Sequence, residues 1–228
     1  MEVKLISWTK DPIGTCAKAA SMCYNSEPSR QIVRGCIKSG HSSIIEHANY
    51  TFKITGVSRS LLAQLTRHRH ASYSVESQRY VKITGDVEFV EPVFANDYAK
   101  EIFADNVTSS LKDYKEMIEC GSEAEDARAV LPNAMPTNLV MTMNLRAMMN
   151  FMNERLCSRA QAEIRKMAKL MKDAVINCPD HTDEDKEIVK SILVPKCERY
   201  EIPFCPEYQC CGRHKKLKEL VKDLQLLR

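Results

Sequence analysis

The sequence has few glycines, a small net charge and no long apolar run. Only 7 of its 228 residues are glycine and 44% are hydrophobic, a composition typical of a folded globular chain. No apolar stretch approaches the roughly 20 residues of a membrane-spanning helix, so we expect no membrane partner. The net charge of +3 is too small for a protein whose whole surface coats nucleic acid. An anion bound by this chain is therefore expected in a local pocket.

The first residues and the cysteines indicate the compartment. Charges at Glu2, Lys4, Lys10 and Asp11 interrupt the region where a signal peptide would need an apolar core. Without such a signal, the 10 cysteines argue for reduced thiols and against a disulfide framework. We therefore expect a cytoplasmic protein.

Hydrophobic periodicity predicts strands early in the chain and mostly helices later. Strands are predicted over 3–8, 47–56 and 86–94. Helices are predicted over 12–24, 29–39, 57–66, 96–120, 122–130, 137–154 and 158–177, with a charged C-terminal helix after them. This order lacks the regular alternation of a doubly wound sheet and favours an α+β fold with a helix-rich C-terminal half. No linker divides residues 1–228, so we expect a single domain.

The stretch RHRHASYSVESQRY, residues 67–80, concentrates hydrogen-bond donors. The planar guanidinium of arginine suits phosphate and stays charged at any working pH. Arg67, Arg69 and Arg79 would form a phosphate cradle if they converge with the serine hydroxyls among them. The residues alone leave open a solvated basic loop, arginines paired with acids, a nucleic-acid grip in which tyrosines stack on bases, or a pocket for a small phosphorylated ligand.

The same stretch resembles the signature of a known enzyme family. Its spacing R-H-R-x-x-S-x-x-x-x-S-x-R is similar to that of the flavin-dependent thymidylate synthases, although the family often has asparagine at Ser74 and glutamate at Val75. GHSSIIEH, residues 40–47, and the segment 128–165 with its R-x-x-L-P start resemble further parts of that family. The resemblance covers roughly residues 1–175 and leaves the cysteine-rich, helical tail 195–228 unassigned.

The resemblance implies an activity. The family methylates C5 of the uracil in dUMP, with 5,10-methylenetetrahydrofolate as carbon donor and FAD, reduced by NADPH, as hydride donor. It further implies a homotetramer with shared active sites and no nucleic-acid partner. The alternative is a basic module that binds nucleotides or nucleic acid without turnover.

The resemblance also assigns residues. Implied FAD contacts are Ser43, Arg67, His68, Arg69, His70, Asn144, Arg146 and Asn150. Implied dUMP contacts are Gln64, Arg67, Val75, Glu76, Ser77, Gln78, Arg79, Arg128 and Arg155. A backbone N–H could serve at Val75 and Glu76, where the side chain would not matter. Arg155 is the implied catalytic group, because a fixed cation at the uracil carbonyls stabilises negative charge on the ring.

The predicted helix 137–154 mixes apolar and polar residues. We read its apolar residues as core: Leu139, Val140, Met143, Met148, Met149 and Met152. An unbroken helix would place Asn144 and Arg155 on one face, and Arg146 and Asn150 form an i, i+4 pair on another. Without the resemblance, such polar residues would be solvent-facing or paired across a subunit contact.

Two clusters raise the question of metal. His41 and His47 flank Glu46, but no fourth ligand lies nearby, and we expect no metal there. By resemblance, His41 and Glu46 would lie near the flavin. The tail holds Cys197, Cys205, Cys210, Cys211 and His214. These could form a structural zinc site or remain reduced, partly buried cysteines, and the C-x7-C-x4-C-C-x2-H spacing does not decide between the two.

Overall fold

The computed structural model describes residues 1–226, and its contacts divide the chain into two compact units. Unit 1 comprises Met1–Glu2, Lys53–Arg69 and Tyr73–Met141. Unit 2 comprises Val3–Phe52, His70–Ser72 and the chain from Thr142 onward. The expectation of one domain over all 228 residues remains a prediction. Within residues 1–226, no helix is both long and apolar enough to cross a bilayer.

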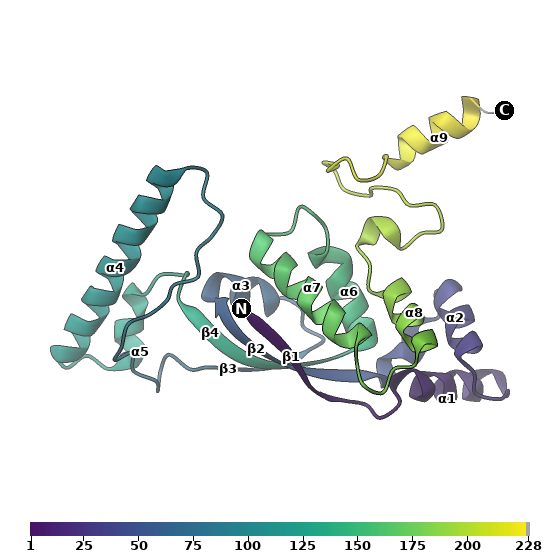
Figure 1. The fold of residues 1–228 in the computed structure, drawn as a ribbon, viewed down its shortest axis with the longest axis horizontal. Helices are drawn as coiled ribbons and strands as arrows, with labels where there is room; N and C mark the ends of the chain where they lie inside the picture. The colour runs from purple at the N-terminus through teal and green to yellow at the C-terminus, as the bar shows by residue number, and fades with distance from the viewer. Residues whose placement is uncertain (227–228) are drawn as a thin grey trace. The chain divides into compact units, whose positions relative to one another are not determined.

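One four-stranded sheet has the order β1-β2-β4-β3 (Figure 1). Its strands are β1 (Glu2–Trp8), β2 (Asn49–Ser58), β3 (Ser72–Val75) and β4 (Pro136–Asn144). Burial alternates along β2 as predicted, and Tyr50, Phe52 and Ile54 are fully buried. The mixture of this sheet with many helices confirms the α+β class.

The predicted helix 137–154 is wrong in its first half, which forms β4. Helix α6 begins only at Leu145 (Leu145–Arg155). Burial in β4 has period two, so Leu139, Met141 and Met143 are buried while Val140 is 36% exposed and is not a core residue. β-Branched residues favour a strand here. Asn144 ends the strand and caps α6, because its side-chain oxygen accepts the N–H of Ala147 at 2.8 Å.

Unit 2 is built mostly from helices. They are α1 (Pro12–Tyr24), α2 (Arg30–Lys38), the 3-10 turn η1 (Ser42–His47), α6, α7 (Ala162–Ile176), α8 (Asp183–Ile192), the 3-10 turn η3 (Lys196–Glu198) and α9 (Leu217–Leu226). The structure confirms α1 and α2. The side chain of Ser29 caps the start of α2, and Gly40, with φ of 81°, lies just past its end. Helix α8 was not predicted, although Thr182 and Asp185 form a capping box at its start.

Unit 1 contains α3 (Arg59–Leu65), α4 (Asp97–Glu119), α5 (Ala124–Ala127) and the 3-10 turn η2 (Arg128–Val130). These confirm the predicted helices over 57–66, 96–120 and 122–130 to within a few residues. The strand predicted over 86–94 is wrong, because this segment is extended but joins no ladder in the described chain. The N–H of Val90 anchors the segment by donating to Ala134 O at 3.0 Å.

Candidate active site

A polar pocket in unit 2 brings four implied FAD contacts together. His70, Asn144, Arg146 and Asn150 line a cavity of about 340 Å³ with Glu46 and Ala147. The start of α6 explains this arrangement, since Asn144 is its cap and Arg146 and Asn150 lie one turn apart. The i, i+4 pair expected from the sequence therefore faces one cavity.

The two charged side chains of this pocket form a pair that solvent still reaches. Arg146 forms an ion pair with Glu46 of η1, and both side chains remain a little under half exposed. The side-chain oxygen of Asn144 is engaged as the helix cap, so a ligand would meet its amide nitrogen. Because guanidinium and amide groups are donors, the pocket suits an anionic or carbonyl-rich ligand.

Two other residues expected near the flavin lie on the same 3-10 turn or beside it. Ser43 is exposed on η1 and does not line the pocket. Nδ1 of His41 is hydrogen-bonded to the hydroxyl of Tyr24 at 2.8 Å, and His41 is not a lining residue either. Of the motif 40–47, Glu46 is thus the residue that reaches the pocket.

Arg155 is the last residue of α6 and is half-buried. The premise that Asn144 and Arg155 share one face of a single helix is wrong, because Asn144 precedes the helix as its cap. Arg155 does not line the 340 Å³ pocket. Its implied role is therefore a prediction that rests on the resemblance.

In unit 1, a tyrosine holds the basic turn after α3. The hydroxyl of Tyr73 lies 3.0 Å from Leu65 O and 2.9 Å from His68 O, and so fixes the turn that carries Arg67 and Arg69. Burial raises the pKa of Tyr73 to about 12, which keeps this donor protonated at neutral pH. Arg67 and Arg69 are exposed, so their guanidinium groups face solvent. Gln64 is half-buried on α3, and its amide lies 3.5 Å from Ser60 O.

Glu125 of α5 gathers two implied dUMP contacts. Its carboxylate accepts hydrogen bonds from Arg79 (Nε at 2.7 Å and Nη2 at 2.6 Å), and its carbonyl accepts from Nε of Arg128 at 3.0 Å. Arg79 also lies over the ring of Tyr80, 5.3 Å from its centroid. Two guanidinium groups are thereby anchored to one residue.

Arg59 was missed by the sequence analysis. It donates to the carbonyl of Glu76 at 2.8 Å, while its Nε is buried without a hydrogen-bond partner among the described residues. Burial lowers the pKa of Arg59; the carboxylate of Glu76 opposes this shift and the charge of Arg128 adds to it. An arginine close to another arginine, with an unsatisfied buried donor, suits the binding of an anion. In the sequence, only the position of Arg59, eight residues before Arg67, could have indicated this role.

The segment 75–79 follows β3, which ends at Val75. The N–H of Glu76 bonds to Asn138 O at 2.9 Å, and its carboxylate accepts from Nδ2 of Asn138 at 2.6 Å. The backbone contact that we expected at Glu76 is thus occupied within the chain. Oγ of Ser77 accepts the N–H of Arg79 at 3.1 Å, and Gln78 is half-buried in the same turn.

Comparisons with known proteins agree with one another. The model of the Thy1 family, described as thymidylate synthase complementing protein, matches residues 4–178. The flavin-dependent thymidylate synthase of Nitratidesulfovibrio vulgaris is 36% identical over 93% of this chain and 94% of its own, and that of Pyrococcus horikoshii is 38% identical over 98% of both. A crystal structure of the Helicobacter pylori enzyme, complexed with FAD and dUMP, is similar with a TM-score of 0.69 and 25% identity, covering 85% of this chain and 100% of that one.

Proposed function

This chain belongs to the family of flavin-dependent thymidylate synthases, and from that premise we propose which of its residues carry the reaction. The protein forms dTMP from dUMP with FAD as its cofactor. The observation that carries the residue assignment is the pocket at the start of α6, where polar residues from three separate segments of the chain line one cavity.

The remaining reactants and the assembly are part of the proposal. Methylenetetrahydrofolate supplies the carbon and NADPH reduces the flavin, as the family resemblance implies. The enzyme acts in the cytoplasm, which the ten free cysteines support. It acts as a homotetramer in which neighbouring subunits complete each site.

The residues of the pocket fit a flavin. Bound FAD supplies the hydride for reductive methylation. Arg146 and the amides of Asn144 and Asn150 would hold its anionic or carbonyl groups, and His70 lies beside them. Glu46 fixes the guanidinium of Arg146 in advance, which lowers the entropy cost of binding. Ser43, Arg67, His68 and Arg69 complete the proposed FAD contacts.

The arginines of unit 1 would hold the phosphate of dUMP. Arg79 and Arg128 are both anchored at Glu125, and each keeps guanidinium N–H groups beyond the bonds described above. Gln64, Arg67, Val75, Glu76, Ser77 and Gln78 are the further proposed contacts. Glu76 is engaged with Asn138, so its contribution is to hold the segment 75–79 in place.

The test of this function is release of tritium from dUMP labelled at C5. We expect release and dTMP formation only when FAD, NADPH and methylenetetrahydrofolate are all present, and we expect the visible FAD spectrum of the purified protein to bleach under NADPH. A protein that binds dUMP and FAD but releases no tritium would be a binding module, and the enzyme assignment would fail.

Ser77 invites the role of a nucleophile, but its surroundings argue against it. A serine hydroxyl needs a positioned general base. The neighbouring carboxylate of Glu76 is hydrogen-bonded to Asn138 at 2.6 Å, and Oγ of Ser77 accepts a backbone N–H. We therefore propose that Ser77 hydrogen-bonds dUMP.

We expect Ser77→Ala to raise the KM for dUMP about tenfold, the cost of one hydrogen bond, and to leave measurable dTMP formation. Ser74→Ala is the matched control, because Ser74 is an exposed serine of the same segment and should behave as wild type. Ser77→Cys should yield no covalent nucleotide adduct by intact mass. A trapped adduct at residue 77 in the wild type, or an inactive Ser77→Ala enzyme that still binds dUMP and FAD normally, would overturn this role.

A further inference from the structure

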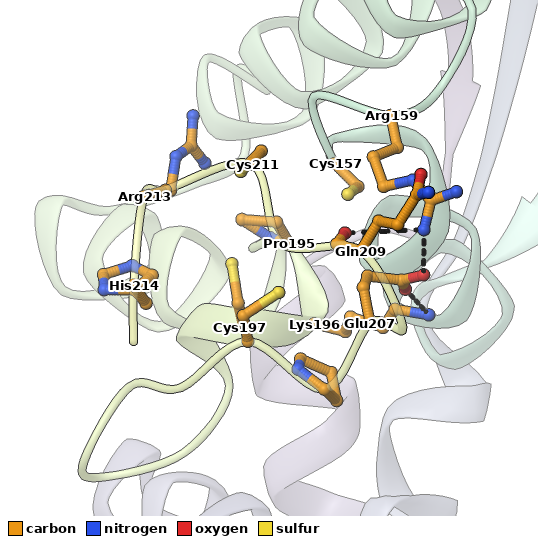
Figure 2. Close-up of a pocket in the computed structure, with 12 residues that line it drawn as sticks. Cys157, Arg159, Pro195, Lys196, Cys197, Glu207, Gln209, Cys211, Arg213 and His214 are labelled. Atoms are coloured by element: carbon orange, nitrogen blue, oxygen red, sulfur yellow. Dashed lines mark hydrogen bonds and ion pairs between the residues drawn. The ribbon is translucent and has the colours of Figure 1, made fainter. Parts of the chain in front are cut away.

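A pocket at the tail of unit 2 gathers sulfur and nitrogen ligands, and its lining residues other than Cys157 and Arg159 lie outside the residues 4–178 that match the family. Cys157, Cys197, Cys205, Cys211 and His214 line one pocket (Figure 2). The space at its centre is about 10 Å³, enough for one particle of the size of a water molecule or a metal ion.

Three ligand atoms of this pocket already approach one another. A sulfur of Cys197, a carboxylate oxygen of Glu198 and a ring nitrogen of His214 lie within 4.8 Å of one another. Nε2 of His214 is buried without a hydrogen-bond partner among the described residues, and its nearest carboxylate oxygen, on Glu198, is 3.6 Å away. A buried imidazole nitrogen with no partner is costly unless something else binds it.

Two further thiols come from the same stretch of the tail. Cys205 lines the pocket, and Cys210 follows it five residues later. Cys210 is tied to His214, since its Sγ lies 3.0 Å from His214 O, and the N–H of Gly212 donates to the same sulfur at 3.3 Å. Gly212 has φ of 89°, a conformation that favours glycine and that points its N–H at the sulfur. These two bonds hold Cys210 beside His214.

The tail has little else to define its shape. Between Pro195 and Lys216 the described secondary structure is η3 and one bridge between Cys205 and Lys216. Ion pairs join it to the rest of unit 2, among them Lys196 with Glu154 and Arg159 with Glu207. Such half-exposed pairs contribute little stability. A short segment with a small core commonly depends on a metal or a disulfide.

We propose that Cys197, Cys205, Cys210 and His214 bind one structural Zn²⁺ ion. Three thiolates and one imidazole form a closed tetrahedral site of the kind that structural zinc prefers, and binding releases the three thiol protons. Glu198 stays beside the site, with a carboxylate oxygen 3.6 Å from Nε2 of His214. Cys211 is not a ligand in this assignment, because it is exposed, whereas Cys197 and Cys205 are buried and Cys210 is half-buried. The site orders the tail and is independent of the chemistry at the nucleotide.

The test is metal analysis of the full-length enzyme purified under reducing conditions without chelator. We expect about one zinc and no iron per chain. Cys197→Ser, Cys210→Ser and His214→Ala should lose the zinc, whereas Cys211→Ser, a change in the same turn, should keep it. A strong chelator should lower the thermal unfolding temperature of the wild type by several degrees, and should not change that of Cys197→Ser.

The zinc content of the wild-type enzyme tests the proposal even if a variant fails to fold. Absence of stoichiometric zinc after reduction and incubation with zinc chloride would overturn the proposal. So would bound iron, or a non-reduced intact mass that shows a disulfide in place of the thiols. Loss of zinc from Cys211→Ser as complete as that from Cys197→Ser would overturn the ligand set.

Discussion

Replacing Arg155 with alanine is expected to lower the rate of dTMP formation about a hundred- to a thousandfold. This is the usual effect of removing one preorganised hydrogen-bond donor from an active site. Arg155 ends α6 and is half-buried. We propose that it contacts the uracil carbonyls, where negative charge develops during methylation. Because this interaction strengthens in the transition state, kcat should fall while FAD still binds.

Two further variants sharpen this experiment. Arg155→Lys should recover little activity, because an ammonium group does not reproduce the planar guanidinium. Arg159→Ala is the matched control, since Arg159 lies four residues on and pairs with Glu207 of the tail at 3.4 Å. Steady-state kcat and the flavin absorbance are measured for each. An Arg155→Ala enzyme with normal kcat would exclude Arg155 from the active site.

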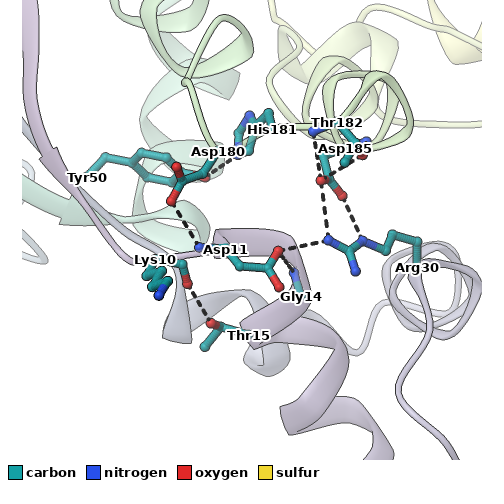
Figure 3. A network of polar contacts seen from close by, with 10 residues as sticks. All are labelled: Lys10, Asp11, Gly14, Thr15, Arg30, Tyr50, Asp180, His181, Thr182 and Asp185. Atoms are coloured by element: carbon teal, nitrogen blue, oxygen red, sulfur yellow. Dashed lines mark hydrogen bonds and ion pairs between the residues drawn. The ribbon is translucent and has the colours of Figure 1, made fainter.

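Replacing Arg30 with alanine is expected to give the largest loss of stability. Arg30 of α2 joins Asp185 of α8 and Asp11 at the start of α1, with distances of 3.1 and 2.8 Å (Figure 3). The side chain of Asp185 is completely buried, so the variant would leave a buried carboxylate without its cation. Losing one partner of a buried pair costs about 3–5 kcal/mol. Because the hydroxyl and the N–H of Thr182 still bind Asp185, we expect about 2–4 kcal/mol.

Arg34→Ala provides the control on the same helix. Arg34 lies one turn after Arg30 and pairs with Glu184 of α8. Both side chains of this pair are about half exposed. An exposed pair contributes at most about 1 kcal/mol. Urea unfolding of both variants measures the difference. If Arg30→Ala and Arg34→Ala lowered the free energy of unfolding equally, the buried pair would contribute no more stability than the exposed one.

The contribution of Arg30 should depend on pH. Burial alone would raise the pKa of Asp185, but the hydrogen bonds from Arg30 and Thr182 outweigh it and the pKa is lowered. A carboxyl with a lowered folded-state pKa stabilises the protein above its unfolded value, about 3.9, and this stability is lost as the pH falls through the folded value. The difference between wild type and Arg30→Ala should therefore be constant from pH 5 to 7 and shrink below about pH 4. A difference that grew on acidification would contradict this account.

Local patterns in the sequence were sufficient for much of the fold. Alternation along 47–56 predicted the buried face of β2, and periodicity predicted α1, α2 and α4, because side-chain spacing along a strand or helix is a property of the chain itself. The motif of residues 67–79 was sufficient for the family, since fixed spacings of arginine and serine are readable without coordinates. These inferences needed no knowledge of which segments meet.

What the sequence could not decide depended on contacts between distant residues. The hydrophobic pattern of residues 137–144 suits either a helix or a strand. Pairing with β2 makes this segment strand β4, and a hydrogen bond of 2.9 Å joins the hydroxyls of Thr51 and Thr142 on the two strands. Residues 86–94 look like a strand but have no ladder partner in the described chain. Arg59 and the pairing of Arg30 with Asp185 became visible only after folding. Burial and partners are set by tertiary packing, which is why local propensity predicts elements better than it predicts sites.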